Sequence, residues 1–428
     1  MSRNNRRFDL SDRLIHFFRD LDLEQSDAPP APEAWGYASV VEDWKMPAFF
    51  LLRHAVRQGR LWATWSVRSG RRGVYGPRPA VCFTEMPIAA YIEASEIRAA
   101  AGEKMGACAL VLPKSAAFAA GARPVIYALS SDAWASGTDG ERTFAPSALP
   151  HQEQYRYVAY DPTKSTLDWT HEREWRWPLD TEPYQEDEDC LPPSSCDKIP
   201  GFDLDHQSMY GLGLIVGNQR QADKIIHDIL TKVDRNDIGE SHYSFIIVRG
   251  DIPDWKVLRD HAEMEAVVYE NLIDLGQFFS VKKAAAREQR DALHALAAKV
   301  EEQTPPPGAN HFDEPGGCWL WLKENRHPLV RALIRLDAIT INENGRYLIE
   351  LPEFDADRPL RQRKEMVTAL AQQLKTRFGV SASYFSVLGS HNPDHIPTYF
   401  DDLVSDPLFY NFNWEDDEND DSDEHVAA

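Results

Sequence analysis

Three consecutive prolines interrupt the chain between Thr304 and Gly308 (TPPPG), and this run limits where helices and strands can lie. Proline has no backbone N–H and disfavours the helical conformation of the residue before it, so neither a helix nor a central strand continues through such a run. We therefore place the main domain boundary there. The length of 428 residues leaves room for two or three domains of about 150 residues each.

Charge and cysteine content limit the classes of function. A formal charge of −22 argues against broad nonspecific binding to nucleic acid, which needs a positive surface. The five cysteines are odd in number and lack CxxC spacing, so neither a disulfide framework nor a zinc ribbon is expected. No apolar run approaches the roughly 20 residues that span a bilayer, and the basic N-terminus leads into no apolar signal region. We expect a cytoplasmic protein with no membrane association and no metal.

Before the prolines, short apolar segments alternate with helical ones. The pattern predicts a helix over 47–59 closed by Gly59, a buried strand over 80–84 (AVCFT) and a βαβ-like unit over 210–250. The GxG in YGLGLIVG lacks the spacing of a dinucleotide motif and indicates a tight buried strand. The irregular spacing of these short strand and helix segments favours a mixed α+β domain over residues 1–254, not a doubly wound sheet. Residues 27–32 (DAPPAP) are expected to form a flexible break, and the polar, acidic and proline-rich stretch 180–206 is expected to be an exposed insertion.

The rest of the chain divides into four predicted parts. They are a helical connector at 255–303, a Pro-rich linker at 304–315, an accessory α+β domain at 316–414 and an acidic disordered tail at 415–428. We expect the accessory domain to run helix, strand pair, helix, strand. Its segment HNPDH (391–395) is interpreted as a turn, because zinc sites need three or four ligands in fixed geometry. The tail holds eight acidic residues, and its alternative role is to attract a basic partner.

Four segments carry residue types that catalysis and ligand binding use. They are RLIHFF around His16, the basic loop RSGRRGVYGPRP with Tyr75, VCFTEMP with Glu85, and HEREWRWP around Glu174. Three of them also have a purely structural interpretation: a buried strand histidine, a helix entrance and a strand-end salt-bridge cluster. In the last segment Glu172 and Glu174 lie two apart, so a strand would place both on one face.

The order of the His-bearing strand, CFTE, GARPVIY, EREWR and LIVGN resembles a bacterial group that includes AbiGi-type abortive phage-resistance proteins. Relatives in that group carry CFSE and EKEYR motifs. The arrangement is more distantly similar to DarT-type ADP-ribosyltransferases, in which a His begins the fold, an aromatic residue follows and a late Glu does the chemistry. The resemblance covers roughly the first 250 residues. The run His16-Phe17-Phe18 departs from the HxT pattern of the DarT group.

This resemblance implies an ADP-ribosyltransferase-like domain in an antiviral effector. Such a toxin transfers ADP-ribose from NAD to a macromolecular acceptor, protein or nucleic acid, or hydrolyses NAD. Cleavage of the bond between nicotinamide and ribose passes through an oxocarbenium-like transition state, which a facing carboxylate stabilises. Glu174 is the expected catalytic carboxylate, and Glu85 is a second carboxylate that supports it or activates the acceptor.

The resemblance also implies which residues bind NAD. His16 would hold the adenosine-side ribose, an arginine would hold the diphosphate by bidentate bonds, and a tyrosine would stack on nicotinamide. The expected set is His16, Tyr75, Arg72, Arg78, Tyr91 and Arg176. The accessory domain would recognise a phage-derived trigger or a partner defence protein.

Two other classes of function stay open. One is a non-catalytic binding or antitoxin-like protein that uses Tyr and Trp surfaces to hold a partner. The other is a magnesium nuclease built on Glu85, Glu172 and Glu174, which predicts three carboxylates close together. The transferase predicts a cleft where His16 and Glu174 converge with an arginine and a tyrosine. The binding protein predicts that packing and salt bridges occupy these positions.

Overall fold

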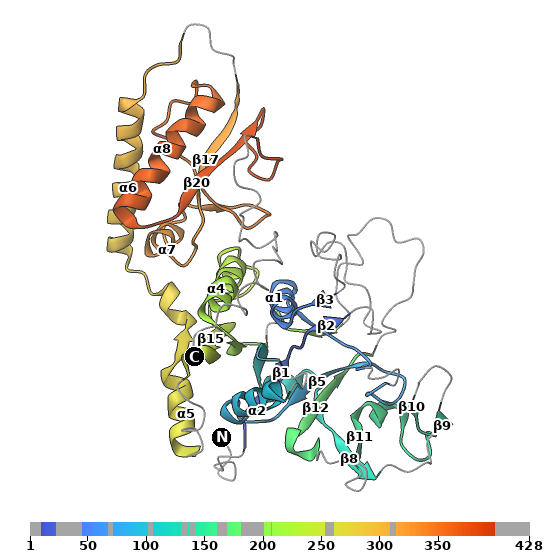
Figure 1. Ribbon diagram of the computed structural model, residues 1–428. Helices are drawn as coiled ribbons and strands as arrows, with labels where there is room; N and C mark the ends of the chain where they lie inside the picture. Colours follow the sequence, from blue (N-terminus) through green and yellow to red (C-terminus); the bar gives the residue numbers. More distant parts are fainter. Residues whose placement is uncertain are drawn as a thin grey trace. The chain divides into compact units, whose positions relative to one another are not determined.

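The computed structural model describes residues 10–22, 45–66, 72–101, 106–129, 135–136, 142–160, 169–180, 201–206, 208–252, 261–308 and 314–398. These residues form a mixed α+β protein with two compact units (Figure 1). Unit 1 comprises Met1–Ile225 and Ser241–Asp274, and unit 2 comprises Ile226–Glu240 and Leu275–Ala428. The predicted break at 27–32, most of the predicted insertion at 180–206 and the acidic tail lie outside the described residues.

Unit 1 is built on an eight-stranded sheet in the order β16-β15-β14-β6-β1-β5-β12-β7. The strands are β1 (Arg13–Phe17), β5 (Ala80–Thr84), β6 (Ala109–Pro113), β7 (Arg123–Pro124), β12 (Glu174–Pro178), β14 (Leu212–Val216), β15 (Tyr243–Val248) and β16 (Leu272–Asp274). Among the strand pairs of this sheet, only β14 and β15 run parallel, and helix α4 (Gln219–Asp234) connects them, which confirms the predicted βαβ unit.

Helices and short strand pairs surround this sheet. The helices are α1 (Ala48–Gln58), α2 (Ile88–Ala100), α3 (Lys114–Ala119) and α5 (His261–Glu270). The short pairs are β2 (Leu21–Asp22) with β3 (Lys45–Met46), β4 (Arg60–Trp62) with β13 (Gly201–Asp203), β8 (Ile126–Leu129) with β11 (Tyr157–Tyr160), and β9 (Ala135–Ser136) with β10 (Arg142–Thr143). Helix α1 ends at Gly59, whose φ of 65° is left-handed, as the sequence predicts. On one face of the sheet, apolar residues of β1, β6, β14 and β15 pack against α2 and α5.

The glycine inside YGLGLIVG serves the packing of the sheet. Every residue of β14 is buried. A Cβ atom at Gly213 would lie 2.1 Å from the Cζ atom of Phe245 on the neighbouring strand β15. The Phe245 ring therefore occupies the space above the glycine, and the segment is the tight buried strand that the sequence predicts.

Unit 2 contains a four-stranded sheet in the order β18-β19-β17-β20. Its elements are η9 (Leu275–Phe279), α6 (Lys283–Gln303), β17 (Gly316–Leu322), α7 (Pro328–Ile334), β18 (Thr340–Ile341), β19 (Tyr347–Ile349), α8 (Leu360–Phe378) and β20 (Ala382–Leu388). The prediction that a helix opens this domain is wrong, because residues 316–322 form strand β17. Leu320 and Leu322 enter the core shared with the helices, whereas Trp319 and Trp321 belong to a second buried cluster. Apolar residues on both faces make such a strand hard to distinguish from a helix.

The division between the units falls elsewhere than at the prolines. Helix α6 places Leu293, Ala297 and Val300 in the core of unit 2, so the Pro-rich segment lies inside that unit. Helix α5 and strand β16 belong to unit 1, which splits the predicted connector at 255–303. Within the described ranges, no helix combines the length and apolar character that crossing a membrane requires.

Candidate functional site

Strands β1, β5 and β12 lie side by side in unit 1. They carry three of the eight predicted site residues, His16 on β1 and Glu174 and Arg176 on β12. Strand β5 pairs with β1 through one register pair, Ile15 opposite Thr84. Strand β12 pairs with β5 along its whole length, beginning with Glu174 opposite Thr84. Thr84 therefore aligns the strand of His16 with that of Glu174.

This register places His16 and Glu174 on opposite faces of the sheet. Residues directly opposite in antiparallel strands point to the same face, so Ile15, Thr84 and Glu174 share one face. His16 follows Ile15 and points to the other face. There its ring meets the rings of Phe18 and Phe83, with centroid distances of 4.9 and 5.9 Å. The two side chains do not converge in one cleft.

His16 has the environment of a strand histidine whose hydrogen bond is satisfied inside the fold. Its Nδ1 atom lies 2.8 Å from the carbonyl oxygen of Cys82. Burial lowers the pKa of His16 to about 4, and the hydrogen bond to Cys82 opposes this shift only in part. Because a carbonyl only accepts, the neutral ring carries its proton on Nδ1 at neutral pH. The ring thus links β1 to β5 beyond their single register pair.

Glu174 is held by an arginine two residues further along the same strand. Arg176 donates from Nε to Oε1 at 2.7 Å and from Nη2 to Oε2 at 3.3 Å. It also donates to the carbonyl oxygens of Tyr155 at 2.8 Å and Tyr157 at 3.3 Å. The Glu174 side chain is 18% exposed and that of Arg176 only 6%. Burial acts to lower the pKa of Arg176, but the surrounding groups, Glu174 first among them, together outweigh burial and raise the pKa, so the guanidinium stays charged.

Glu85 forms a second internal ion pair. Its Oε1 atom accepts from Lys114 Nζ at 2.9 Å, and its Oε2 atom accepts from the indole Nε1 of Trp175 at 2.7 Å. Lys114 also donates to the carbonyl oxygen of Ser11. Lys114 and Trp175 are 29 and 90 residues from Glu85 along the chain, so sequence reasoning missed both partners.

Glu172 has yet another partner. The predicted shared strand face of Glu172 and Glu174 is wrong, because Glu172 ends a 3-10 helix (Trp169–Glu172) and β12 begins only at Glu174. Between them Arg173 has a φ of 46°, which turns the chain. Arg98 on α2 donates to Glu172 at 2.9 Å. Each of the three carboxylates thus has its own cation, as in a salt-bridge cluster at a strand end. In the ranges described, no three His, Cys, Asp or Glu side chains are placed to hold a metal.

Both tyrosines predicted to stack on nicotinamide lie in the core. Tyr75 packs against Phe144 and Tyr157, with centroid distances of 5.6 and 5.0 Å. Tyr91 on α2 is fully buried and donates from its hydroxyl to the carbonyl oxygen of Gly106 at 2.7 Å. Burial raises the pKa of Tyr91. Neither ring has a free face for a ligand ring in this conformation.

The predicted diphosphate arginines are engaged near the surface. The Arg72 guanidinium lies 3.9 Å from the ring centroid of Trp65. Arg78 pairs with Asp180 and lies 5.2 Å from the ring centroid of Tyr155. Tyr75, Arg78 and Arg176 all contact the segment 155–157, so these three lie near one another. His16 lies on the opposite face of the sheet from Arg176, so the complete predicted NAD-binding set does not meet. A residue that the sequence did not single out, Tyr127, accepts from the backbone N–H of Glu174 at 3.1 Å.

The described parts define a mixed α+β protein of two units. Residues 286–412, inside unit 2, match a family described as a protein of unknown function (DUF4427). No curated protein and no solved structure matches the chain. The match covers under half of the chain and does not extend to unit 1.

Proposed function

We propose that the chain is a non-catalytic, antitoxin-like binding protein of a cytoplasmic phage-defence system, and that unit 1 binds a protein partner. One observation carries the proposal: internal ion pairs and core packing occupy the positions expected to bind NAD and to catalyse its cleavage. Glu174 is neutralised by Arg176 and Glu85 by Lys114, while His16 faces away from Glu174. The link to phage defence rests on the resemblance of the first 250 or so residues.

An aromatic and cationic patch of unit 1 supports binding to a partner. Phe118, in the last turn of α3, is 50% exposed. The guanidinium of Arg123 lies 4.1 Å from its ring centroid, and Trp175 meets it edge to face at 6.5 Å. Arg123 lies on β7, an edge strand of the sheet. Aromatic residues and arginine dominate the binding energy of protein interfaces, so this patch is the expected contact surface.

The test measures NAD turnover directly. The purified full chain and its Glu174→Gln variant are incubated with labelled NAD in bacterial lysate, with and without phage infection. The proposal expects no nicotinamide release and no label transfer from either protein. Turnover by the wild type that the variant lacks would overturn the proposal.

Binding through the patch is tested by phage plating on cells that express the chain. Phe118→Ser should abolish any effect of the chain on plating. Ile97→Ser is the matched control, because Ile97 is equally exposed on α2. Equal behaviour of the two variants counts against the patch.

ADP-ribose transfer from NAD, or NAD hydrolysis, is the second candidate. It is favoured by the junction at Ile15 and Thr84, where a single register pair joins β1 and β5 beside the neutral ring of His16. The resemblance puts the NAD ribose at this histidine. Catalysis would require Glu174 to leave Arg176, and the NAD assay above decides between the two candidates.

A further inference from the structure

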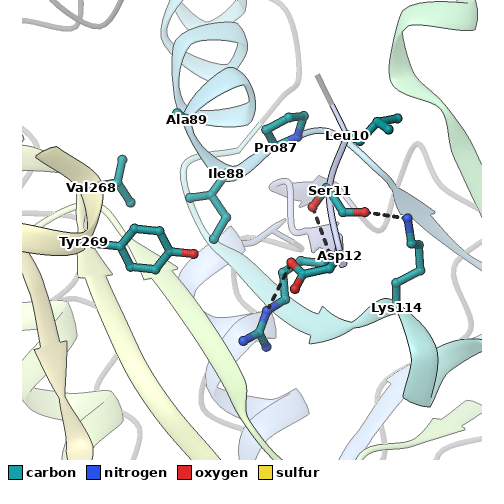
Figure 2. Close-up of a pocket in the computed structure, with 10 residues that line it drawn as sticks. Leu10, Ser11, Asp12, Pro87, Ile88, Ala89, Lys114, Val268 and Tyr269 are labelled. Atoms are coloured by element: carbon teal, nitrogen blue, oxygen red, sulfur yellow. Dashed lines mark hydrogen bonds and ion pairs between the residues drawn. The ribbon is translucent and has the colours of Figure 1, made fainter. Parts of the chain in front are cut away.

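The proposed function leaves two features of the described residues unused, a cavity in unit 1 and an aromatic sheet face in unit 2. The cavity lies where β1 begins, and Figure 2 shows the side chains that line it. The two cations of its lining are engaged within the fold: Lys114 pairs with Glu85 at 2.9 Å, and Arg13 donates to the carbonyl oxygen of Gly211 at 2.6 Å. The cavity therefore presents no uncompensated cation to a ligand.

The sheet of unit 2 is buried on both of its faces. Helices α6, α7 and α8 pack on one face, and Figure 1 shows α6 and α8 on the same side of β17 and β20. The opposite face, which we call the aromatic face, consists of Trp319, Trp321, Leu348, Phe385 and Val387. Each of these residues comes from a strand and is at most 4% exposed. Antiparallel sheets with one face in water carry polar residues there, so another part of the chain covers the aromatic face.

Within unit 2, few residues are available for this cover. Besides its described elements, the unit holds residues 309–313 and 399–428. The five residues 309–313 lie between Pro305 and Glu314, whose carbonyl oxygens accept hydrogen bonds from the first turn of α8. Helix α8 packs on the other face of the sheet. Residues 399–428 are therefore the remaining part that is long enough to lie across the aromatic face.

The chain that follows β20 lies on the side of the aromatic face. Strands β18 and β20 are opposite edges of the sheet. In the turn after β18, Asn342 donates from Nδ2 to the carbonyl oxygen of Pro393 at 3.0 Å. The chain then returns to β20, where the backbone N–H of Thr398 donates to the carbonyl oxygen of Ser386 at 2.7 Å. Because the helices fill one face, residues 389–398 pass over the other, and the described part of the chain ends beside it.

The sequence that follows Thr398 has the pattern of a strand that packs on an apolar surface. Residues 399–414 contain six aromatic residues, three aspartates and neither Lys nor Arg. From Tyr410 to Trp414 (YNFNW) aromatic residues alternate with asparagines. An extended backbone would thus direct Tyr410, Phe412 and Trp414 to one side and the asparagines to the other.

Charge and the family match agree with this occupant. The Nζ atom of Lys323 lies 5.1 Å, and the guanidinium of Arg346 5.3 Å, from the ring centroid of Trp321 on the aromatic face. Residues 399–414 bring only negative charge toward these cations, which favours their approach. The family match ends at residue 412, so it includes most of this segment and stops before the acidic tail.

We propose that residues 408–414 dock on the aromatic face in an extended conformation and bury Tyr410, Phe412 and Trp414 there. The ten residue steps from Thr398 to position 408 span up to about 33 Å. This reach exceeds the width of four strands spaced about 4.8 Å apart. Docking gives the sheet its second layer and holds the start of the acidic tail at unit 2.

This inference is independent of the proposed partner binding, because the patch around Phe118 belongs to unit 1. Cross-linking of the full chain in dilute solution tests it. The photoreactive residue p-benzoylphenylalanine replaces Phe412, and mass spectrometry maps the products. The links should lie within one chain and end in β17, β19 or β20. Asn413→p-benzoylphenylalanine is the matched control, because the alternation turns this position away from the sheet, and it should give none of these links.

Thermal unfolding verifies that both cross-linking variants fold and tests the same contact with smaller side chains. Phe412→Ser should lower the Tm of unit 2 by about 6 °C or more, because it removes a buried aromatic ring. Asn413→Ser is the matched control and should shift the Tm by less than about 2 °C. Links from position 412 to a second copy or to another part of the chain would overturn the proposal. Equal Tm shifts for the two serine variants would overturn it as well.

Discussion

Replacing Arg176 tests whether the Glu174–Arg176 pair is part of the structural framework. Arg176→Met preserves the length of the side chain but leaves a carboxylate and two carbonyl oxygens, those of Tyr155 and Tyr157, without their donor. Removing one partner of a buried ion pair lowers the free energy of unfolding by about 3–5 kcal/mol, because the remaining charge stays in a medium that solvates it poorly. The pair meets this condition, since its members are 6% and 18% exposed.

Thermal unfolding of the full chain, followed by circular dichroism, measures the effect. For a unit of 150–250 residues, 1 kcal/mol corresponds to about 2–4 °C in Tm, so Arg176→Met should lower the transition of unit 1 by about 6–20 °C. Arg156→Met is the matched control, because Arg156 pairs with Glu153 at 22% and 42% exposure. Such a pair is worth roughly 0–1 kcal/mol, and the control should shift Tm by no more than about 4 °C.

A double-mutant cycle with Glu174→Gln isolates the coupling between the two side chains. Neighbours in one ion pair couple by about 0.5–3 kcal/mol, so the double variant should be more stable than the sum of the single effects predicts. If Arg176→Met destabilises no more than Arg156→Met, the pair is not structural. Glu174 would then be available for chemistry, and the proposed binding function would lose the observation that carries it.

Three further predictions concern pH, the core of unit 2 and the glycine of β14. Folding lowers the pKa of His16 from 6.5 to about 4, so the unfolded chain binds a proton at a higher pH than the folded chain does. The free energy of unfolding of the wild type should therefore fall by up to ~3 kcal/mol between pH 6.5 and 4. Urea unfolding at pH 7 and 4.5 should show a correspondingly smaller decrease for His16→Gln. Asp234 is buried and accepts from Arg331 at 2.6 and 3.0 Å, so Asp234→Asn should cost about 3 kcal/mol or more in thermal unfolding, and a change under 1 kcal/mol would contradict the buried pair. Gly213→Ala should lower the free energy of unfolding by about 1–3 kcal/mol, because the new methyl group meets the Phe245 ring. Adding Phe245→Leu, which has a smaller side chain, should restore part of that stability, and no restoration would argue against the contact.

Elements defined by near neighbours were predictable. The strand at 80–84 follows from a short apolar run, and the end of α1 follows from Gly59, which adopts the left-handed conformation without steric cost. Strand β17 was mistaken for a helix, because its apolar residues face two different cores and leave no alternating pattern. The domain boundary was misplaced for a similar reason: α6 joins a core whose other members follow the prolines.

The α+β class, the βαβ unit and the residue types at the candidate site follow from local sequence patterns. Which of these residues meet depends on how the strands pair in the folded chain. Whether His16 and Glu174 share a face depends on which residue lies opposite Thr84, and a shift of one position would reverse the answer. The cation that neutralises Glu85 comes from 29 residues away, directly after the end of β6. Strand β1 lies between β6 and β5 in the sheet, and no local pattern specifies that order. The chemistry of each side chain is known from its position in the sequence, whereas strand register and long-range pairing depend on the packing of the whole sheet.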